Sequence, residues 1–406
     1  MLVRPFVALS IGVLITLRLA IIFGTPSYDS FGDLSIYREV GELVVHGIDP
    51  YDPASRPELR QELRLNGHGV PASTDLGSYN FYVGANLPGS TLLYGVIERF
   101  AESARGWRIA LVLGDLSLLL SAVFFLRRNG IADRPDAQLA LFLTVVCCPS
   151  LLYWGTLLAE DKQYQTALMI LLAGFLSAPG KRPGADAAMI GVVGALSILF
   201  KAFGLFLAPV ALLYFLRRPT RELLIAAVVA TIVALPLIFY FDLSFITRML
   251  DRLRAGGTVW NNFHGSPWQL VPLDVAQLAR PMVCISLIAL SVWAYVRGAI
   301  DLLNASAAIC VVFGCLWLIS GSMDRMNMAM VFAVICTATV STRLWLLLSI
   351  LNFAWQVPLY WQYGGERTDA IAAALFVAFY FPMLLSAPAR RSLVTAPYPA
   401  PSTLPA

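Results

Sequence analysis

Long apolar runs separated by short polar segments dominate this 406-residue sequence. About 12 runs can be read along the chain, at 6–24, 108–126, 138–153, 163–178, 186–201, 203–216, 222–241, 281–296, 302–320, 326–341, 344–361 and 370–386. Several are shorter than the roughly 20 residues of an ideal membrane-spanning helix, so their ends are defined only to within a few residues. The pattern predicts an all-α, polytopic membrane protein with about 12 transmembrane helices.

The composition points to the same class of protein. Residues of the apolar set make up 58% of the chain, charged residues only 13%, and the mean hydropathy is +0.71. A soluble globular protein carries about 25% charged residues. This chain therefore has more apolar surface than one water-soluble core can bury, and its repeated apolar runs exclude disorder, collagen and coiled coil.

Several kinds of site are excluded by what the sequence lacks. All six cysteines fall inside apolar runs without CxxC or Cys/His spacing, which argues against a disulfide framework and against zinc. There are only three histidines, so a histidine-rich metal site is excluded. No GxxxxGK[ST] run suggests an ATP-driven pump, and nothing resembles a nucleic-acid-binding module.

The arginines predict the orientation of the chain in the membrane. If the amino terminus is inside and every run except 87–101 crosses, the basic clusters at 127–134, 181–182 and 217–221 lie in short cytoplasmic loops. Counting 87–101 as a full span would place these clusters outside. We therefore interpret 87–101 as a partial or re-entrant helix on the outer side.

This arrangement predicts a single membrane domain over residues 1–395, with both termini inside. Two large outer loops, at about 25–107 and 242–280, are expected to carry amphipathic helices. No A-x-A-like cleavage site follows Gly24, so the first run is expected to stay as an anchor. The proline-rich tail 396–406 is predicted to be disordered.

The first outer loop contains a predicted helix that could carry chemistry. Apolar residues three or four positions apart predict a helix over about 33–45 that lies along the membrane surface and ends before Gly47. Asp33 and Tyr37 share one face of this helix. Asp33 has two interpretations: a capping residue in the pair Ser30-x-x-Asp33, or a functional carboxylate at the membrane surface.

Two further polar groups stand at the outer ends of predicted spans. Glu160, Asp161 and Lys162 are adjacent and either bind a metal, a sugar or a phosphate, or form a solvated turn whose charges pair with each other. Lys201 lies at the tip of an apolar hairpin. It is either an anchor that reaches the interface or a contact for a lipid phosphate.

The second outer loop combines aromatic rings with amide and imidazole groups. Asn262 and His264 lie between Trp260 and Trp268. Tryptophans are common at membrane boundaries, where they form a belt. The same set of side chains also suits sugar binding, because amides bond to hydroxyls and flat rings cover C–H faces. The segment alone does not decide between belt and binding site.

A resemblance to a known family rests on three spaced motifs. They are Asp33-x3-Tyr37-x9-Gly47-x2-Pro50-Tyr51 after the first run, Phe81-Tyr82-x5-Pro88, and Phe200-Lys201-x7-Pro209. In this order the motifs resemble the GT-C membrane glycosyltransferases, most closely the polyprenol-phosphate-mannose-dependent branch (glycosyltransferase family 87-like). The resemblance covers about residues 1–220.

The resemblance implies a GT-C-like fold and an inverting transferase in a bacterial inner membrane, with its active site on the outer, periplasmic face. Mannose or another sugar would move from polyprenyl phosphate to a hydroxyl of a glycolipid or glycan acceptor. Asp33 would be the general base. The residues expected to bind substrate are Tyr37, Tyr51, Glu160, Asp161, Lys162, Lys201, Asn262 and His264.

The expected partners are the lipid-linked donor, the acceptor and the bilayer, with no nucleic acid. No cofactor is predicted, although a divalent metal stays open. Two other classes also stay open: a transporter or flippase of a lipid-linked sugar, and an accessory subunit of an envelope-assembly complex. Two long, polar, aromatic outer loops favour the enzyme over a simple carrier.

Overall fold

The protein is described here by a computed structural model, which covers residues 3–25, 33–51, 87–101, 103–149, 151–157, 161–177, 182–200, 211, 214–215, 218–241, 243, 245–247, 267–317, 331–332, 335–339, 341–361 and 366–386. Every regular element within these ranges is a helix, which confirms the predicted all-α class. The number of about 12 spans, the single domain 1–395 and the disordered tail 396–406 stay predictions.

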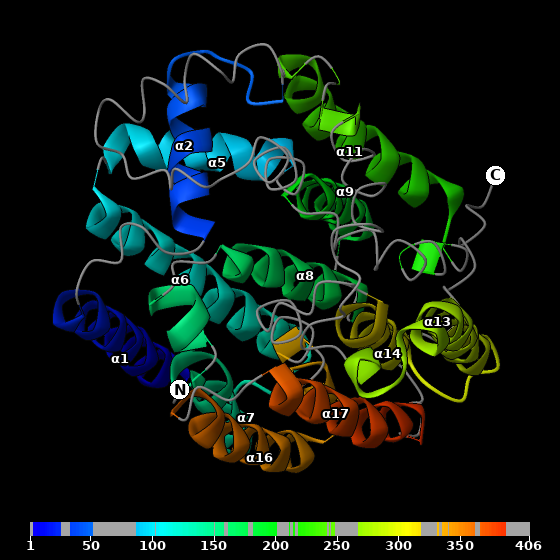
Figure 1. Cartoon of the computed structure of the whole chain (residues 1–406). Coiled ribbons are helices and arrows are strands. Elements are labelled where there is room, and N and C mark those ends of the chain that lie inside the picture. Colours follow the sequence, from blue (N-terminus) through cyan, green and yellow to red (C-terminus); the bar gives the residue numbers. More distant parts are fainter. Residues whose placement is uncertain are drawn as a thin grey trace, which may run out of the picture.

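Five of the described helices are long and apolar enough to cross a membrane. They are α1 (Val3–Gly24), α6 (Ala104–Arg128), α9 (Pro183–Phe200), α11 (Thr220–Tyr240) and α13 (Leu273–Val296). The remaining helices are α2 (Asp33–Val45), α5 (Pro88–Phe100), α7 (Pro135–Leu141), α8 (Lys162–Ser177), α14 (Leu302–Val311), α16 (Thr342–Trp361) and α17 (Glu366–Ser386). Three π-helical segments, Phe142–Val146, Leu151–Leu157 and Val312–Trp317, and two 3₁₀ turns, Pro267–Leu270 and Thr337–Thr339, complete the set. Figure 1 shows α2 and α5 together in the upper part, and α7, α16 and α17 in the lower part.

Helix α6 packs along its length against α8, and the two helices run in the same direction. The hydroxyl of Tyr164 donates to the carbonyl of Ala110 (3.2 Å) near the start of both helices. At their far ends the amide of Asn129 donates to Ser177 Oγ (3.0 Å). Helix α9 runs back alongside α8. Near the start of α8, Gln165 Nε2 donates to the carbonyl of Ser197, near the end of α9 (2.9 Å).

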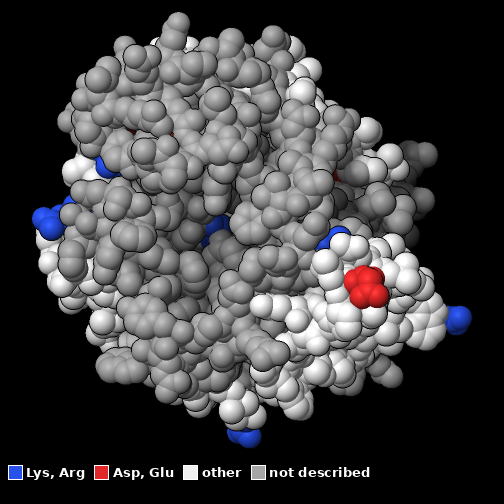
Figure 2. Space-filling model, in the orientation of Figure 1, with Lys and Arg blue, Asp and Glu red and all other residues white. Residues whose placement is uncertain are grey.

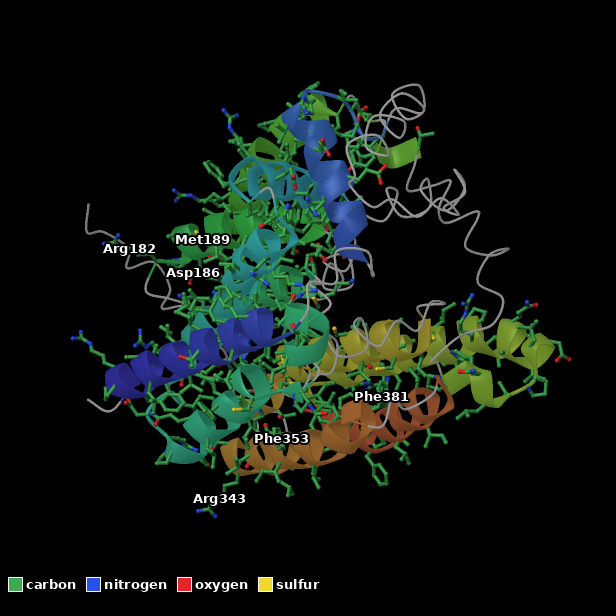
Figure 3. The ribbon with its side chains drawn as sticks, turned by 60° about the vertical axis from the view of Figure 1, so that its left-hand side comes forward. Arg182, Asp186, Met189, Arg343, Phe353 and Phe381 are labelled. Atoms are coloured by element: carbon green, nitrogen blue, oxygen red, sulfur yellow. The ribbon has the colours of Figure 1, made fainter. Side chains whose placement is uncertain are left out.

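This register collects basic residues at one end of the bundle, which we call the arginine-rich end. Arg128, in the last turn of α6, pairs with Asp186 in the first turn of α9 (2.5 Å) and lies over the ring of Phe175 (5.0 Å). Arg134 donates to Thr342 (3.5 Å), which brings the start of α16 to the same end. In Figure 3, Arg182 projects at the left and Arg343 projects at the bottom.

The run 138–153, which was predicted as one span, is not one continuous helix. Helix α7 continues into the π-helix Phe142–Val146, and the chain then breaks before the π-helix Leu151–Leu157. The break lies at Cys147 and Cys148, and Pro149 directly follows it. A proline has no N–H with which to continue a helical ladder. The carbonyls that the break leaves without helical partners must therefore find other donors.

Arg18 of α1 supplies these donors. Its Nη2 donates to the carbonyl of Val145 (3.1 Å), its Nη1 donates to the carbonyl of Val146, and its Nε donates to Asp115 of α6 (3.1 Å). Both charged side chains are buried, at 0% and 2% exposure. The pair thus holds a broken membrane helix against two intact ones, with its charges balanced.

The outer surfaces of α11 and α13 are apolar. Phe239 is 74% exposed and Leu278 is 70% exposed, and large apolar side chains are exposed along both helices. Among the described atoms that Figure 2 shows, most belong to uncharged residues. Such surfaces are unusual for a protein in water and suit contact with lipid tails.

Candidate functional site

Helix α2 has the bounds that the sequence predicts, Asp33–Val45, and ends as predicted. Gly47 has a φ of +71°, the left-handed conformation that glycine adopts without strain. Ile48 N–H donates to the carbonyl of Leu43 (2.9 Å), and Gly47 N–H donates to that of Val44 (3.0 Å). These two bonds satisfy the last carbonyls of the helix.

The position of α2 differs from the prediction. Its apolar residues Leu34, Tyr37, Val40 and Leu43 are at most 2% exposed. They pack mainly against α5, which crosses beneath α2 (Figure 1), rather than along a lipid surface. The apolar stripe of α2 is therefore covered by protein, mainly by α5.

Glycines permit this close approach of the two helices. A Cβ atom on Gly41 of α2 would lie 2.6 Å from the carbonyl oxygen of Tyr94 on α5. A Cβ atom on Gly95 would lie 2.5 Å from the side chain of Val44. The backbones therefore meet where no side chain separates them.

Asp161 is the polar centre of this region. Tyr37 of α2 donates its hydroxyl to Oδ1 of Asp161 (3.3 Å), and Tyr94 of α5 donates to Oδ2 (2.6 Å). The two tyrosine rings stack with centroids 4.6 Å apart. Because Asp161 immediately precedes α8, one carboxylate joins three helices that are distant in the sequence.

The burial of this cluster contradicts the interpretation of Asp161 and Lys162 as a solvated turn. Asp161 is 1% exposed and Lys162 is 7% exposed. A buried carboxylate needs hydrogen-bond donors to replace water, and the two tyrosines provide them. The interpretation as a solvated turn failed because burial depends on α2 and α5, which contribute from more than 60 residues away in the chain.

A second polar contact lies one helical turn along α5. Trp107 of α6 donates its indole N–H to Glu98, and Arg38 Nε lies 3.9 Å from the same carboxylate. The Trp107 ring also lies 6.0 Å from that of Tyr94. This contact ties α2, α5 and the start of α6 together beside Asp161.

Tyr51 is fixed on the other side of α5. Its hydroxyl bonds to that of Thr91 (2.7 Å), and its ring packs against Phe241 and Phe245. Burial raises the pKa of Tyr51 well above its usual value, because the phenolate would lose its hydration. Tyr51 is 1% exposed and stays neutral.

The end of α9 reaches the same region. Ser90 of α5 donates its hydroxyl to the carbonyl of Phe200, and a Cβ on Gly89 would lie 3.1 Å from the carbonyl oxygen of Leu199. The described part of α9 therefore ends on α5, one residue before Lys201 in the sequence.

Some predicted site residues lie outside the part of the chain that the structure describes. Only the backbone position of Asp33 is described, as the first residue of α2. The other residues outside the described ranges are Glu160, Lys201, Asn262 and His264. The structure thus brings together Tyr37, Tyr51, Asp161 and Lys162, which belong to separate motifs in the sequence.

Sequence reasoning missed several residues that build this region. Tyr94 lies inside the run 87–101, where an aromatic residue gives no signal of its own. Arg18 and Asp115 did carry a signal. Each is an ionisable residue inside a long apolar run, and such residues usually have a buried partner.

The described residues hold no cluster of three or more His, Cys, Asp or Glu side chains that could bind a metal ion. A comparison with protein-family models finds none that matches the chain, and a comparison with curated proteins finds no match either.

Proposed function

We propose that this protein is an integral membrane glycosyltransferase of a bacterial inner membrane. It transfers mannose or another sugar from polyprenyl phosphate to an acceptor hydroxyl on the outer face, with inversion at the sugar carbon. The observation that carries this proposal is the hydrogen bond from Tyr37 to Asp161. It joins the two polar motifs that sequence analysis singled out independently on the same predicted side of the membrane.

The distance between this site and the arginine-rich end supports the proposal. Trp107 and Arg128 stand at opposite ends of α6, almost six helical turns or about 30 Å apart. This equals the thickness of the hydrocarbon core of a bilayer. If the arginines face the cytoplasm, the Asp161 region lies at the outer interface.

The proposed reaction assigns a role to each group. Asp33 takes the proton of the acceptor hydroxyl, and the hydroxyl oxygen forms a bond to the anomeric carbon. The bond between that carbon and the phosphate oxygen breaks, and the lipid phosphate leaves with the electron pair. Lys162 and Lys201 are the cations assigned to the negative charge that develops on the phosphate.

The direct test is a transfer assay with the purified protein in lipid nanodiscs. The substrates are a radiolabelled polyprenyl-phosphate sugar and a glycolipid extract as acceptor. We expect label in the acceptor fraction, and release of polyprenyl phosphate. Absence of transfer from mannose, glucose and arabinose donors by a folded protein would reject the proposal.

The second candidate is a flippase for a lipid-linked sugar, and the buried Arg18–Asp115 pair beside a broken helix favours it. Discontinuous helices and intramembrane charges are common features of transporters. In sealed vesicles a flippase would move a fluorescent lipid-linked sugar between leaflets without forming a product. A transferase would consume the donor.

A further inference from the structure

The contacts of Asp161 suggest a role other than direct contact with substrate. Both of its oxygens accept hydrogen bonds from tyrosine hydroxyls, and its exposed fraction is 1%. Tyr94 is 0% exposed and Tyr37 is 2% exposed. A ligand would have to displace this packed cluster in order to reach the carboxylate.

The two hydrogen bonds require an acceptor with two oxygens. An ionised carboxylate only accepts hydrogen bonds and can serve both phenols at once. An asparagine at this position has one oxygen, and its NH₂ group would face a phenol that has lost its acceptor. The cluster is therefore specific for a carboxylate and not only for a side chain of this size.

One of the two phenols belongs to the helix that begins at Asp33. Tyr37 follows Asp33 by four residues, which is about 6 Å along the axis of α2. Glycines 41 and 95 fix the crossing of α2 and α5 further along, and Tyr37, near the start of α2, bonds to Asp161, which directly precedes α8. The position of the start of α2 thus depends on Asp161.

We infer that Asp161 is a positioning residue, which sets the place of Asp33 through Tyr37 and is not itself the base. This inference rests on the proposed role of Asp33. Two substitutions separate it from a simple packing role. Asp161→Asn keeps the volume and one acceptor oxygen, whereas Asp161→Ala keeps neither.

The matched control is Tyr380→Phe, in a part of the protein far from α2 (Figure 1). Tyr380 is 2% exposed, stacks on Phe376 at 4.6 Å and bonds to Thr337 (3.4 Å), so it matches Tyr37 in burial and in ring stacking. Loss of this phenol removes one buried hydrogen bond without touching the site. Transfer activity in Tyr380→Phe should equal that of the wild type.

The kinetic experiment measures kcat and the donor KM in nanodiscs. Asp161→Ala should lower kcat by about 10- to 100-fold, because displacing a reacting group by 1 Å is enough for such a loss. The kcat of Asp161→Asn should lie between those of Asp161→Ala and the wild type. The donor KM should stay unchanged in both variants. Adding Tyr37→Phe to Asp161→Ala should lower kcat no further, since the phenol has already lost its acceptor.

A second readout does not depend on transfer activity. Cysteine is placed at position 33, and its rate of reaction with a membrane-impermeant maleimide is measured in the full-length protein. We expect Asp161→Ala to change this rate and Tyr380→Phe to leave it unchanged. Unchanged labelling together with unchanged kcat would overturn the inference, whereas changed labelling in a protein without transferase activity would reject only the proposed function.

Discussion

Arg18 and Asp115 form a buried ion pair between helices whose residues lie 97 positions apart, with Nε and Oδ2 at 3.1 Å. The guanidinium also caps the carbonyls of Val145 and Val146, where the helix breaks before Pro149. A positive charge at the carboxyl end of a helix is favourable, because the unpaired carbonyls there carry partial negative charge. One side chain therefore donates to the free carbonyls at the break and also balances the charge of Asp115.

Removal of Arg18 should destabilise the protein strongly. Arg18→Met leaves Asp115 as an uncompensated buried charge, and such changes cost about 3–5 kcal/mol of unfolding free energy. The double variant Arg18→Met with Asp115→Leu should recover part of this loss, because no lone charge remains buried. Thermal unfolding in detergent, followed by tryptophan fluorescence, measures both effects.

The control for this experiment is Arg343→Met, because Arg343 is exposed at the start of α16. Its loss should change the unfolding temperature little. If Arg18→Met is no more harmful than Arg343→Met, the pair does not hold the broken helix.

The crossing of α2 and α5 should tolerate no side chain at position 41. Gly41→Ala places a methyl group 2.6 Å from the carbonyl oxygen of Tyr94, so the helices must move apart. Overpacking of this kind costs about 1–3 kcal/mol, and we expect a lower unfolding temperature. Gly12→Ala on α1 is the matched control, since nothing lies within 4 Å of its new Cβ.

In Gly12→Ala the unfolding temperature should stay the same or rise, because alanine favours a helix over glycine. A Gly41→Ala protein as stable as Gly12→Ala would contradict the close approach of α2 and α5.

Local pattern was sufficient to predict some of these elements. The bounds of α2 and the stop at Gly47 follow from the spacing of apolar residues and from one glycine. Within 87–101 the chain forms α5, a helix of 13 residues and about 20 Å, which is too short to cross a bilayer, and the arginine count of the other loops had predicted a partial helix here. For α2 the signal lies within one segment of the chain, whereas for α5 it lies in the arginines of other segments.

Features that depend on contacts between distant segments could not be predicted. Nothing near Asp161 in the sequence shows that Tyr37 and Tyr94 cover it, so a solvated turn was an equal alternative. The break before Pro149 was hidden inside an apolar run, and its cap comes from α1. Hydropathy reports how apolar a residue is but not which residue it will meet.

The topology can be tested with introduced cysteines at two exposed positions. His46 follows α2 and is predicted to be outside, and Ala185 lies in the first turn of α9, at the arginine-rich end. A membrane-impermeant maleimide should label His46→Cys in intact cells and should label Ala185→Cys only after the cells are opened. The opposite pattern would reverse the orientation and place the Asp161 region inside the cell.

The buried phenol of Tyr51 predicts a dependence of stability on alkaline pH. Burial raises its pKa above the value of about 10 that the unfolded chain has. Its contribution is therefore complete below pH 10 and declines above it, because only the unfolded state then releases the proton. At pH 8 the unfolding free energy of Tyr51→Phe should be about 1 kcal/mol below that of the wild type, because the hydrogen bond to Thr91 is lost. Between pH 10 and pH 11 the unfolding free energy of Tyr51→Phe should decrease less than that of the wild type. Equal slopes in this range would indicate that Tyr51 titrates in the same way in both states.

The catalytic role of Asp33 is tested by Asp33→Asn. Asparagine caps a helix start about as well as aspartate, so a purely capping role predicts near-normal turnover. A general base must accept a proton, which the amide cannot do usefully, so the proposed role predicts a fall of roughly 10²–10⁴-fold in kcat at unchanged expression. The other candidate carboxylates, Asp29, Asp49, Glu160 and Asp161, are replaced by their amides in parallel. Asp49 accepts a hydrogen bond from Tyr51 N–H (2.9 Å), so its amide should affect folding more than chemistry.

If Asp33→Asn stays active while Asp29→Asn or Glu160→Gln loses turnover, the base is that residue and the transferase proposal stands. If all five variants keep wild-type transfer, none of these carboxylates is the base.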